Sequence, residues 1–151
     1  MRGSGCCLRF IALMACGLVR PQPVRAQIPV LSVPEGPHAP GDTVRVTLAN
    51  RAEGTIGYNL CTTALERRSG DAWTRVASER ICTMELRTLE PRARADYPLA
   101  LEPDLPSGTY RFRTQVHMPL GPAPPVGVVT KPFHVAAGGA GDTAAPRKSR
   151  S

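Results

Sequence analysis

The stretch GTYRFRTQVHM, residues 108–118, shows the clearest alternation of side-chain character in the chain. One parity is mostly apolar and consists of Tyr110, Phe112, Thr114, Val116 and Met118. The other parity is polar and consists of Arg111, Arg113, Gln115 and His117. Because successive side chains of a β-strand point to opposite faces of a sheet, this pattern predicts a strand with one buried and one solvated face.

The same period of two recurs on both sides of this stretch. It is clear in TVRVTLAN (43–50) and ADYPLAL (95–101). Further short runs bounded by turn residues are IPVLSV (28–33), YNLCTTALERR (58–68), AWTRV (72–76), CTMELRTL (82–89) and VGVVTKPFHVA (126–136). Seven or eight strands with a turn signal about every 10 residues predict an all-β, antiparallel β-sandwich.

Prolines and helix signals refine this prediction. Pro29, Pro98 and Pro132 fall within strand-like runs, and proline cannot donate to a β-ladder, so these runs are expected at sheet edges or bulges. The best helical candidate is a single turn near ALERR, residues 64–68, where the alternation suits a strand equally well.

The first residues are typical of an export signal. A basic start, MRGSGCCLR, precedes about ten apolar residues, too few to span a bilayer, and Val24 and Ala26 then offer small residues for cleavage. We therefore expect residues 1–26 to be a signal peptide and the protein to be secreted or periplasmic. Two alternatives stay open: lipoprotein anchoring through Cys16 in the segment LMAC, and an uncleaved anchor.

The remaining chain is expected to form one domain, residues 27–136, followed by a disordered basic tail, residues 137–151. The full chain has 19 basic and 12 acidic residues, a net charge of +7. Without the four arginines of the signal and the three basic and one acidic residues of the tail, 12 basic and 11 acidic residues remain. The high overall charge is therefore no evidence for a nucleic-acid partner.

Two cysteines, Cys61 and Cys82, remain once the signal is removed. In an oxidising compartment they are most simply one disulfide, which by the chain-entropy estimate stabilises the fold by about 3 kcal/mol. The close Cys-x-x-Cys spacing of a redox-active pair is absent, and a free or metal-bound pair is the remaining alternative.

The segment LEPDLPSGTYRFRTQV, residues 101–116, resembles the entry to the penultimate strand of immunoglobulin-like and fibronectin-type domains. There a tyrosine hydrogen-bonds backwards across a corner, and Tyr110 matches it. Over residues 40–116 the order of segments is similar to bacterial immunoglobulin-like (Ig-like) domains of secreted and envelope proteins. This resemblance implies an Ig-like β-sandwich without catalytic residues. The antibody disulfide is not implied, because Phe112 stands where its second cysteine would lie.

Motifs for catalysis, cofactors and metals are weak in this sequence. It lacks a Gly-x-Ser-x-Gly elbow in the mature chain, a His-Glu-x-x-His motif and a phosphate-binding glycine loop, so we expect no enzyme and no cofactor. His117, His134, Met84 and Met118 invite a copper-carrier hypothesis, but the alternation puts His117 and Met118 on opposite faces. Surface histidines and core methionines are the simpler interpretation.

The aromatic and charged residues around the cysteines are also expected to be structural. Trp73 is predicted to pack within the hairpin RRSGDAWTRV, with sugar binding as the alternative. The many arginines are expected on a solvated face rather than on a stripe for anionic polymers. The acidic residues Glu66, Asp71, Glu79 and Glu85 are interspersed among them.

The sequence thus predicts a non-catalytic binding or structural module of the cell envelope, whose partner would be a protein or an envelope polymer. One expected contact surface is the proline-rich loop 119–125, and the exposed arginine-bearing strand faces are the other. The candidate residues of the loop are Pro119, Leu120, Pro122, Pro124 and Pro125. Two rival functions remain: an inhibitor of extracellular proteases acting through the same loop, and a metal carrier using His117 and His134.

Overall fold

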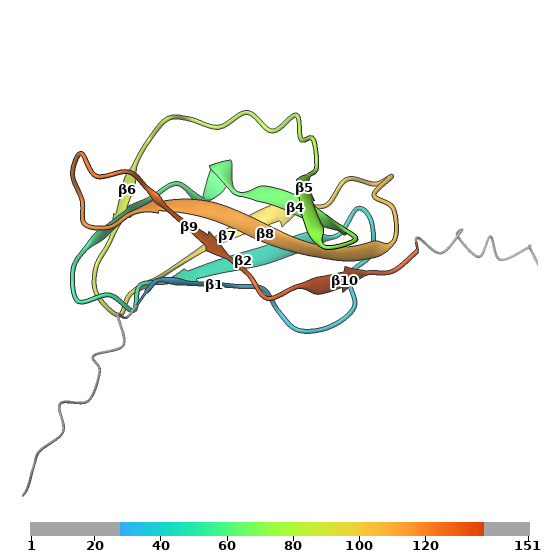
Figure 1. The fold of residues 1–151 in the computed structure, drawn as a ribbon, viewed down its shortest axis with the longest axis horizontal. Coiled ribbons are helices and arrows are strands. Elements are labelled where there is room, and N and C mark those ends of the chain that lie inside the picture. The colour runs from blue at the N-terminus through green and yellow to red at the C-terminus, as the bar shows by residue number, and fades with distance from the viewer. Residues whose placement is uncertain (1–27, 138–151) are drawn as a thin grey trace, which may run out of the picture.

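The computed structural model describes residues 28–137, which form two antiparallel sheets enclosing one hydrophobic core (Figure 1). The predicted signal peptide, the alternative lipid site at Cys16 and the predicted tail beyond residue 137 lie outside the described residues. Within residues 28–137 no helix is long and apolar enough to cross a membrane. The predicted all-β fold class is confirmed.

The smaller sheet has three strands in the order β1-β2-β7. These are β1 (Val30–Ser32), β2 (Thr43–Ala49) and β7 (Arg94–Ala100). Strand β7 pairs with β2 alone, from Thr43 opposite Ala100 to Ala49 opposite Arg94. Pro98 therefore lies on an edge strand, as predicted, where a missing N–H group is tolerated.

The larger sheet is built around β8 (Gly108–His117), which runs along most of the length of the sandwich (Figure 1). Its order is β5-β4-β8-β3-β6, and β9 and β10 also pair with β8. The other strands are β3 (Ile56–Tyr58), β4 (Ala64–Ser69), β5 (Ala72–Arg75), β6 (Arg87–Leu89), β9 (Val126–Val129) and β10 (Phe133–Val135).

The structure has ten strands where seven or eight were expected, because two predicted strands are interrupted. The run 58–68 is broken by a 3-10 turn, η1 (Leu60–Thr62), in which the Cys61 N–H group donates to the Asn59 side chain. The run 126–136 is broken at Thr130, whose hydroxyl accepts a hydrogen bond from the Phe112 N–H group.

Two further local predictions can be compared with the structure. Of the two alternatives for residues 64–68, the strand is formed, as part of β4, and the only described helical turn is η1. Of the strand expected over residues 82–89, only Arg87–Leu89 is paired. Residues 77–86 form a loop instead, because Cys82 is bonded to η1 rather than to a neighbouring strand.

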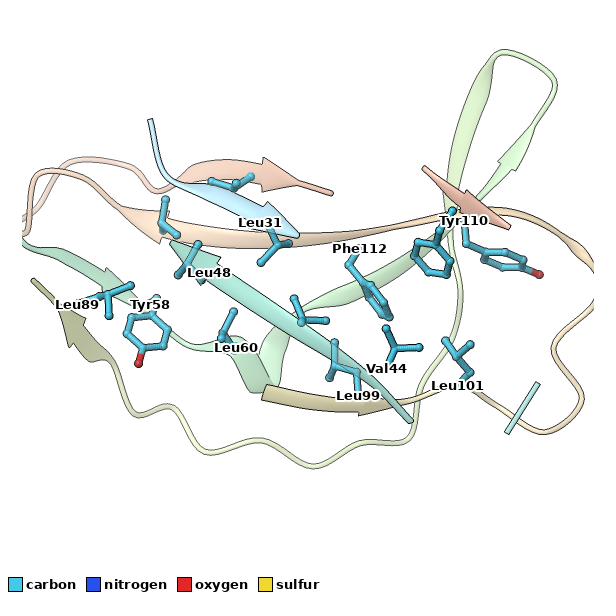
Figure 2. Packing of buried hydrophobic residues seen from close by; sticks show 14 of the residues in the cluster. Leu31, Val44, Leu48, Tyr58, Leu60, Leu89, Leu99, Leu101, Tyr110 and Phe112 are labelled. Carbon is cyan, nitrogen blue, oxygen red and sulfur yellow. The ribbon is translucent and has the colours of Figure 1, made fainter. Parts of the chain in front are cut away.

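The core confirms the parity predicted for residues 108–118 (Figure 2). Tyr110 and Phe112 of β8 are buried against β2 and β7, which contribute Val44, Leu48 and Leu99. Phe133 of β10 extends this cluster, with its ring centroid 5.3 Å from that of Phe112. Burying each such side chain contributes roughly 1.5–3 kcal/mol, so the apolar parity of β8 stabilises the fold together with the core residues of the other strands.

Candidate functional site

Cys61 and Cys82 form a disulfide, as the sequence predicts. Cys61 lies on η1, and Cys82 lies in the segment between β5 and β6, 21 residues further along the chain. We refer to residues 77–86 as the cystine loop. In Figure 1 this loop arches along one long side of the sandwich, from β5 to β6.

Side chains complete the attachment of the cystine loop to the body. The Arg80 guanidinium donates from Nε to the Cys61 carbonyl at 2.8 Å and from Nη2 to the Thr63 carbonyl at 2.5 Å. The Asn59 amide, which also caps η1, donates to the Thr83 carbonyl at 2.7 Å. The loop is therefore held by a covalent bond and three side-chain hydrogen bonds, without a β-ladder of its own.

The cystine loop presents apolar side chains to solvent. Ile81 is 96% exposed and Met84 is 95% exposed, which is unusual for side chains of this kind. Leu86, at the end of the same loop, is 48% exposed. Sequence reasoning missed these residues because Met84 and Leu86 have the parity of a buried strand face.

The proline-rich loop 119–125 meets the cystine loop at Gly57. A Cβ atom on Gly57 would lie 2.7 Å from Cδ2 of Leu120 and 2.9 Å from Cδ2 of Leu86, so both leucines pack over this glycine. The remaining predicted loop residues, Pro119, Pro122, Pro124 and Pro125, are exposed. We call the exposed apolar residues of the two loops the loop patch; they are Ile81, Met84, Leu86 and Leu120.

Tyr110 lies at the start of β8 and is fully buried. Its hydroxyl donates to the carbonyl of Pro106, four residues upstream, at 2.5 Å. This is the backward hydrogen bond that the resemblance implies. Burial raises the pKa of Tyr110 above its ordinary value, and the nearby positive charge of Arg67 partly opposes this rise. The hydroxyl is thus held as a neutral donor that ties the corner to the strand.

A second surface forms on the outward side of the larger sheet. Glu66 of β4 lies opposite Arg111 of β8 and Arg75 of β5, so these three side chains share a face. Arg111 donates from Nε to the Glu66 carboxylate at 2.6 Å, and Nη1 of Arg113 lies 3.7 Å from the other carboxylate oxygen. The Arg111 guanidinium also lies 4.2 Å from the centroid of the Trp73 ring.

Trp73 belongs to the β4-β5 hairpin, as predicted, and is partly exposed beside the arginines. Arg68 lies directly opposite Trp73 in this hairpin. We call this surface the arginine face; it consists of Arg68, Arg75, Arg111 and Arg113 with Glu66 and Trp73.

The acidic residues that separate these arginines in the sequence do not all separate them in space. Asp71 is in the hairpin turn, and Glu79 and Glu85 are in the cystine loop. Only Glu66 of the four shares the arginine face, where its carboxylate is paired with Arg111. From the sequence we expected all four acidic residues to interrupt the positive charge of the arginines. In the structure only Glu66 does so on the arginine face.

The two histidines considered for metal binding lie far apart along the larger sheet. His117 is the last residue of β8, whereas His134 belongs to β10 and is paired with Thr109, the second residue of β8. Eight residues of strand separate these positions, a distance of about 26 Å. Among residues 28–137 no group of three or more His, Cys, Asp or Glu side chains is placed to hold a metal ion.

The two-sheet topology, with a buried corner tyrosine at the start of its central strand, defines an Ig-like β-sandwich. Among solved structures the chain is similar to the ASH/PapD-like domain (PapD-like domain 7) of human CEP192, with 13% identity and a TM-score of 0.37. The match covers 82% of this chain and 96% of that one. No protein-family profile and no curated protein sequence matches the chain.

Proposed function

We propose that this chain is a non-catalytic, secreted or periplasmic Ig-like module of the bacterial cell envelope, and that it binds a protein partner through the loop patch. The observation that carries the proposal is the exposure of Ile81 and Met84, at 96% and 95%, on a loop cross-linked to the body. Apolar side chains gathered on an exposed surface mark protein contact sites.

The attachment of the loop supports binding as well as stability. A loop held by a disulfide and by Arg80 and Asn59 loses little conformational entropy when a partner covers it. Methionine adapts its shape to irregular partner surfaces, and Met84 stands next to the rigid attachment at Cys82. The arrangement combines a fixed backbone with adaptable apolar side chains.

The proposed location rests on two features. Disulfides persist in oxidising compartments such as the periplasm and the extracellular space, and this chain contains one. The N-terminal residues also have the composition of an export signal. The lipoprotein alternative through Cys16 keeps the same compartment and places the module on a membrane surface.

The test uses the mature chain as bait in envelope extract from its host, followed by affinity measurement with the purified partner. Changing Ile81 and Met84 to Ser should weaken partner binding at least 100-fold, because each side chain loses roughly 1.5–3 kcal/mol of apolar burial and about 1.4 kcal/mol is a factor of ten. The matched control changes Ile28 and Val30, 58% and 39% exposed near β1, to Ser and should leave the affinity unchanged. Equal affinity for wild type and the I81S/M84S variant contradicts the proposal.

The same experiment tests the alternative function of protease inhibitor. The exposed prolines and Leu120 of loop 119–125 support that alternative, because an inhibitory loop must be accessible to a protease. A captured protease whose active site is blocked would favour inhibition. In that case binding should fall on changing Leu120 to Ala and should survive the I81S/M84S change.

A further inference from the structure

The arginine face carries more positive charge than the composition of the domain suggests. Residues 28–137 contain 12 basic and 11 acidic residues and are almost neutral. The arginine face nevertheless brings four arginines together with one glutamate, because alternate residues of β4, β5 and β8 share its parity. We propose that this face binds an acidic polysaccharide, through its arginines and Trp73.

The internal contacts of the face leave several cationic groups available. Glu66 is buried and engages Arg111 at 2.6 Å, so its negative charge is largely directed at one arginine. Arg113 is 48% exposed and lies 3.7 Å from the same carboxylate. Arg68 and Arg75 are exposed on the hairpin. The face therefore keeps net positive charge after its own ion pairs are formed, which complements a polyanion.

The arginines of β8 are held in position before any ligand arrives. The Arg111 guanidinium is fixed between the Glu66 carboxylate and the Trp73 ring. Arg113 lies across Gly127 of β9, where a Cβ atom would come within 3.2 Å of Nη2 and 3.3 Å of Nε. Glycine at position 127 thus lets the planar guanidinium lie close to the sheet. Such preorganisation reduces the entropy lost when a guanidinium binds a carboxylate.

The combination of one indole with several guanidinium groups favours a glycan over other polyanions. Arginine recognises carboxylate groups with two parallel hydrogen bonds, and an indole ring can pack on the apolar side of a sugar ring. Single-stranded nucleic acid is usually held by several aromatic side chains that stack successive bases. On the arginine face Trp73 is the one aromatic side chain.

The experiment measures binding of polygalacturonate to the mature chain by calorimetry at low ionic strength. Changing Arg68, Arg75 and Arg113 together to Gln should weaken binding at least tenfold, and added salt should weaken wild-type binding in the same direction. Arg111 is left unchanged so that buried Glu66 keeps its partner. The matched control changes three exposed arginines around the smaller sheet, Arg45, Arg51 and Arg94, to Gln. It removes the same charge and should bind within twofold of wild type.

Two further measurements distinguish a glycan site from nonspecific attraction between opposite charges. Changing Trp73 to Ala should weaken binding of polygalacturonate severalfold and leave binding of polyglutamate, a carboxylate polymer without sugar rings, unchanged. Equal losses in the arginine-face and control variants, or tighter binding of single-stranded DNA than of polygalacturonate, would overturn the proposal. The I81S/M84S variant should bind polygalacturonate like wild type, so that this inference and the proposed protein contact can fail separately.

Discussion

Strand β8 and the cystine loop are both well defined, but different forces hold them in place. Strand β8 pairs with four strands and buries alternate side chains in the core. The cystine loop pairs with no described strand and is attached by one disulfide and the side chains of Arg80 and Asn59. The first region is fixed by burial, which hides its apolar residues. The second is fixed by cross-linking, which leaves its apolar residues exposed to solvent.

The largest expected effect comes from removing a core side chain of β8. Changing Phe112 to Ala should lower the free energy of unfolding by about 3–5 kcal/mol, because it removes a buried ring and leaves a cavity beside Phe133. Urea denaturation followed by circular dichroism measures this loss. A loss below 1 kcal/mol would show that β8 does not organise the core.

A smaller effect, concentrated on the cystine loop, is expected from removing the disulfide. Changing Cys61 and Cys82 together to Ala should lower the free energy of unfolding by about 2–4 kcal/mol, because the unfolded chain is no longer cross-linked. Amide exchange should accelerate in residues 77–86 and stay slow in β8. Titration of the exported wild-type protein should find no free thiol.

Two results would contradict this account of the disulfide. One is free thiol in the exported protein. The other is a double variant whose cystine loop exchanges as slowly as that of wild type, since the loop would then be held by contacts other than the cross-link. Loss of partner binding together with faster exchange in the loop would connect the cross-link to the loop patch.

The alternation in the sequence predicted the structure of β8 correctly but not that of the cystine loop, and the reason is physical. Alternation predicts a strand when burial decides the structure, and burial decides it over residues 108–118. In the cystine loop Met84 and Leu86 follow the same alternation, but Cys82 is tied to η1 and the segment cannot pair along its length. The disulfide was predictable from the cysteine count and from the oxidising compartment that the N-terminal residues predict, whereas the exposure of Ile81 required the structure.

The arginine face shows a related limit. Glu79 and Glu85 are close to arginines in the sequence, but they lie in the cystine loop, away from the ladder that pairs β4 with β8. Charge on a sheet surface depends on which strands are neighbours and on their register. Neither the β4-β8 pairing nor the position of Arg111 over Trp73 could be assigned from local sequence.

The smallest expected effect concerns the hydroxyl at the start of β8. Changing Tyr110 to Phe should lower the free energy of unfolding by about 0.5–1.5 kcal/mol near pH 7, because the Pro106 carbonyl loses its donor. Burial raises the pKa of Tyr110 in the folded protein, whereas an unfolded tyrosine titrates near 10.0. The unfolded state therefore releases its proton first as the pH rises.

This order of titration gives the sign of the pH dependence. The contribution of the neutral Tyr110 hydroxyl is fully present below pH 10.0 and is lost as the pH rises toward the higher pKa of the folded state. The stability difference between wild type and Y110F should thus be constant from pH 7 to 9 and shrink above pH 10. Tyr58 and Tyr97 are present in both proteins and cancel in the difference. A difference that grows above pH 10 would mean that the Tyr110 phenolate is stabilised in the fold. The positive charge of Arg67 would then outweigh burial, and the corner would depend on an ion pair.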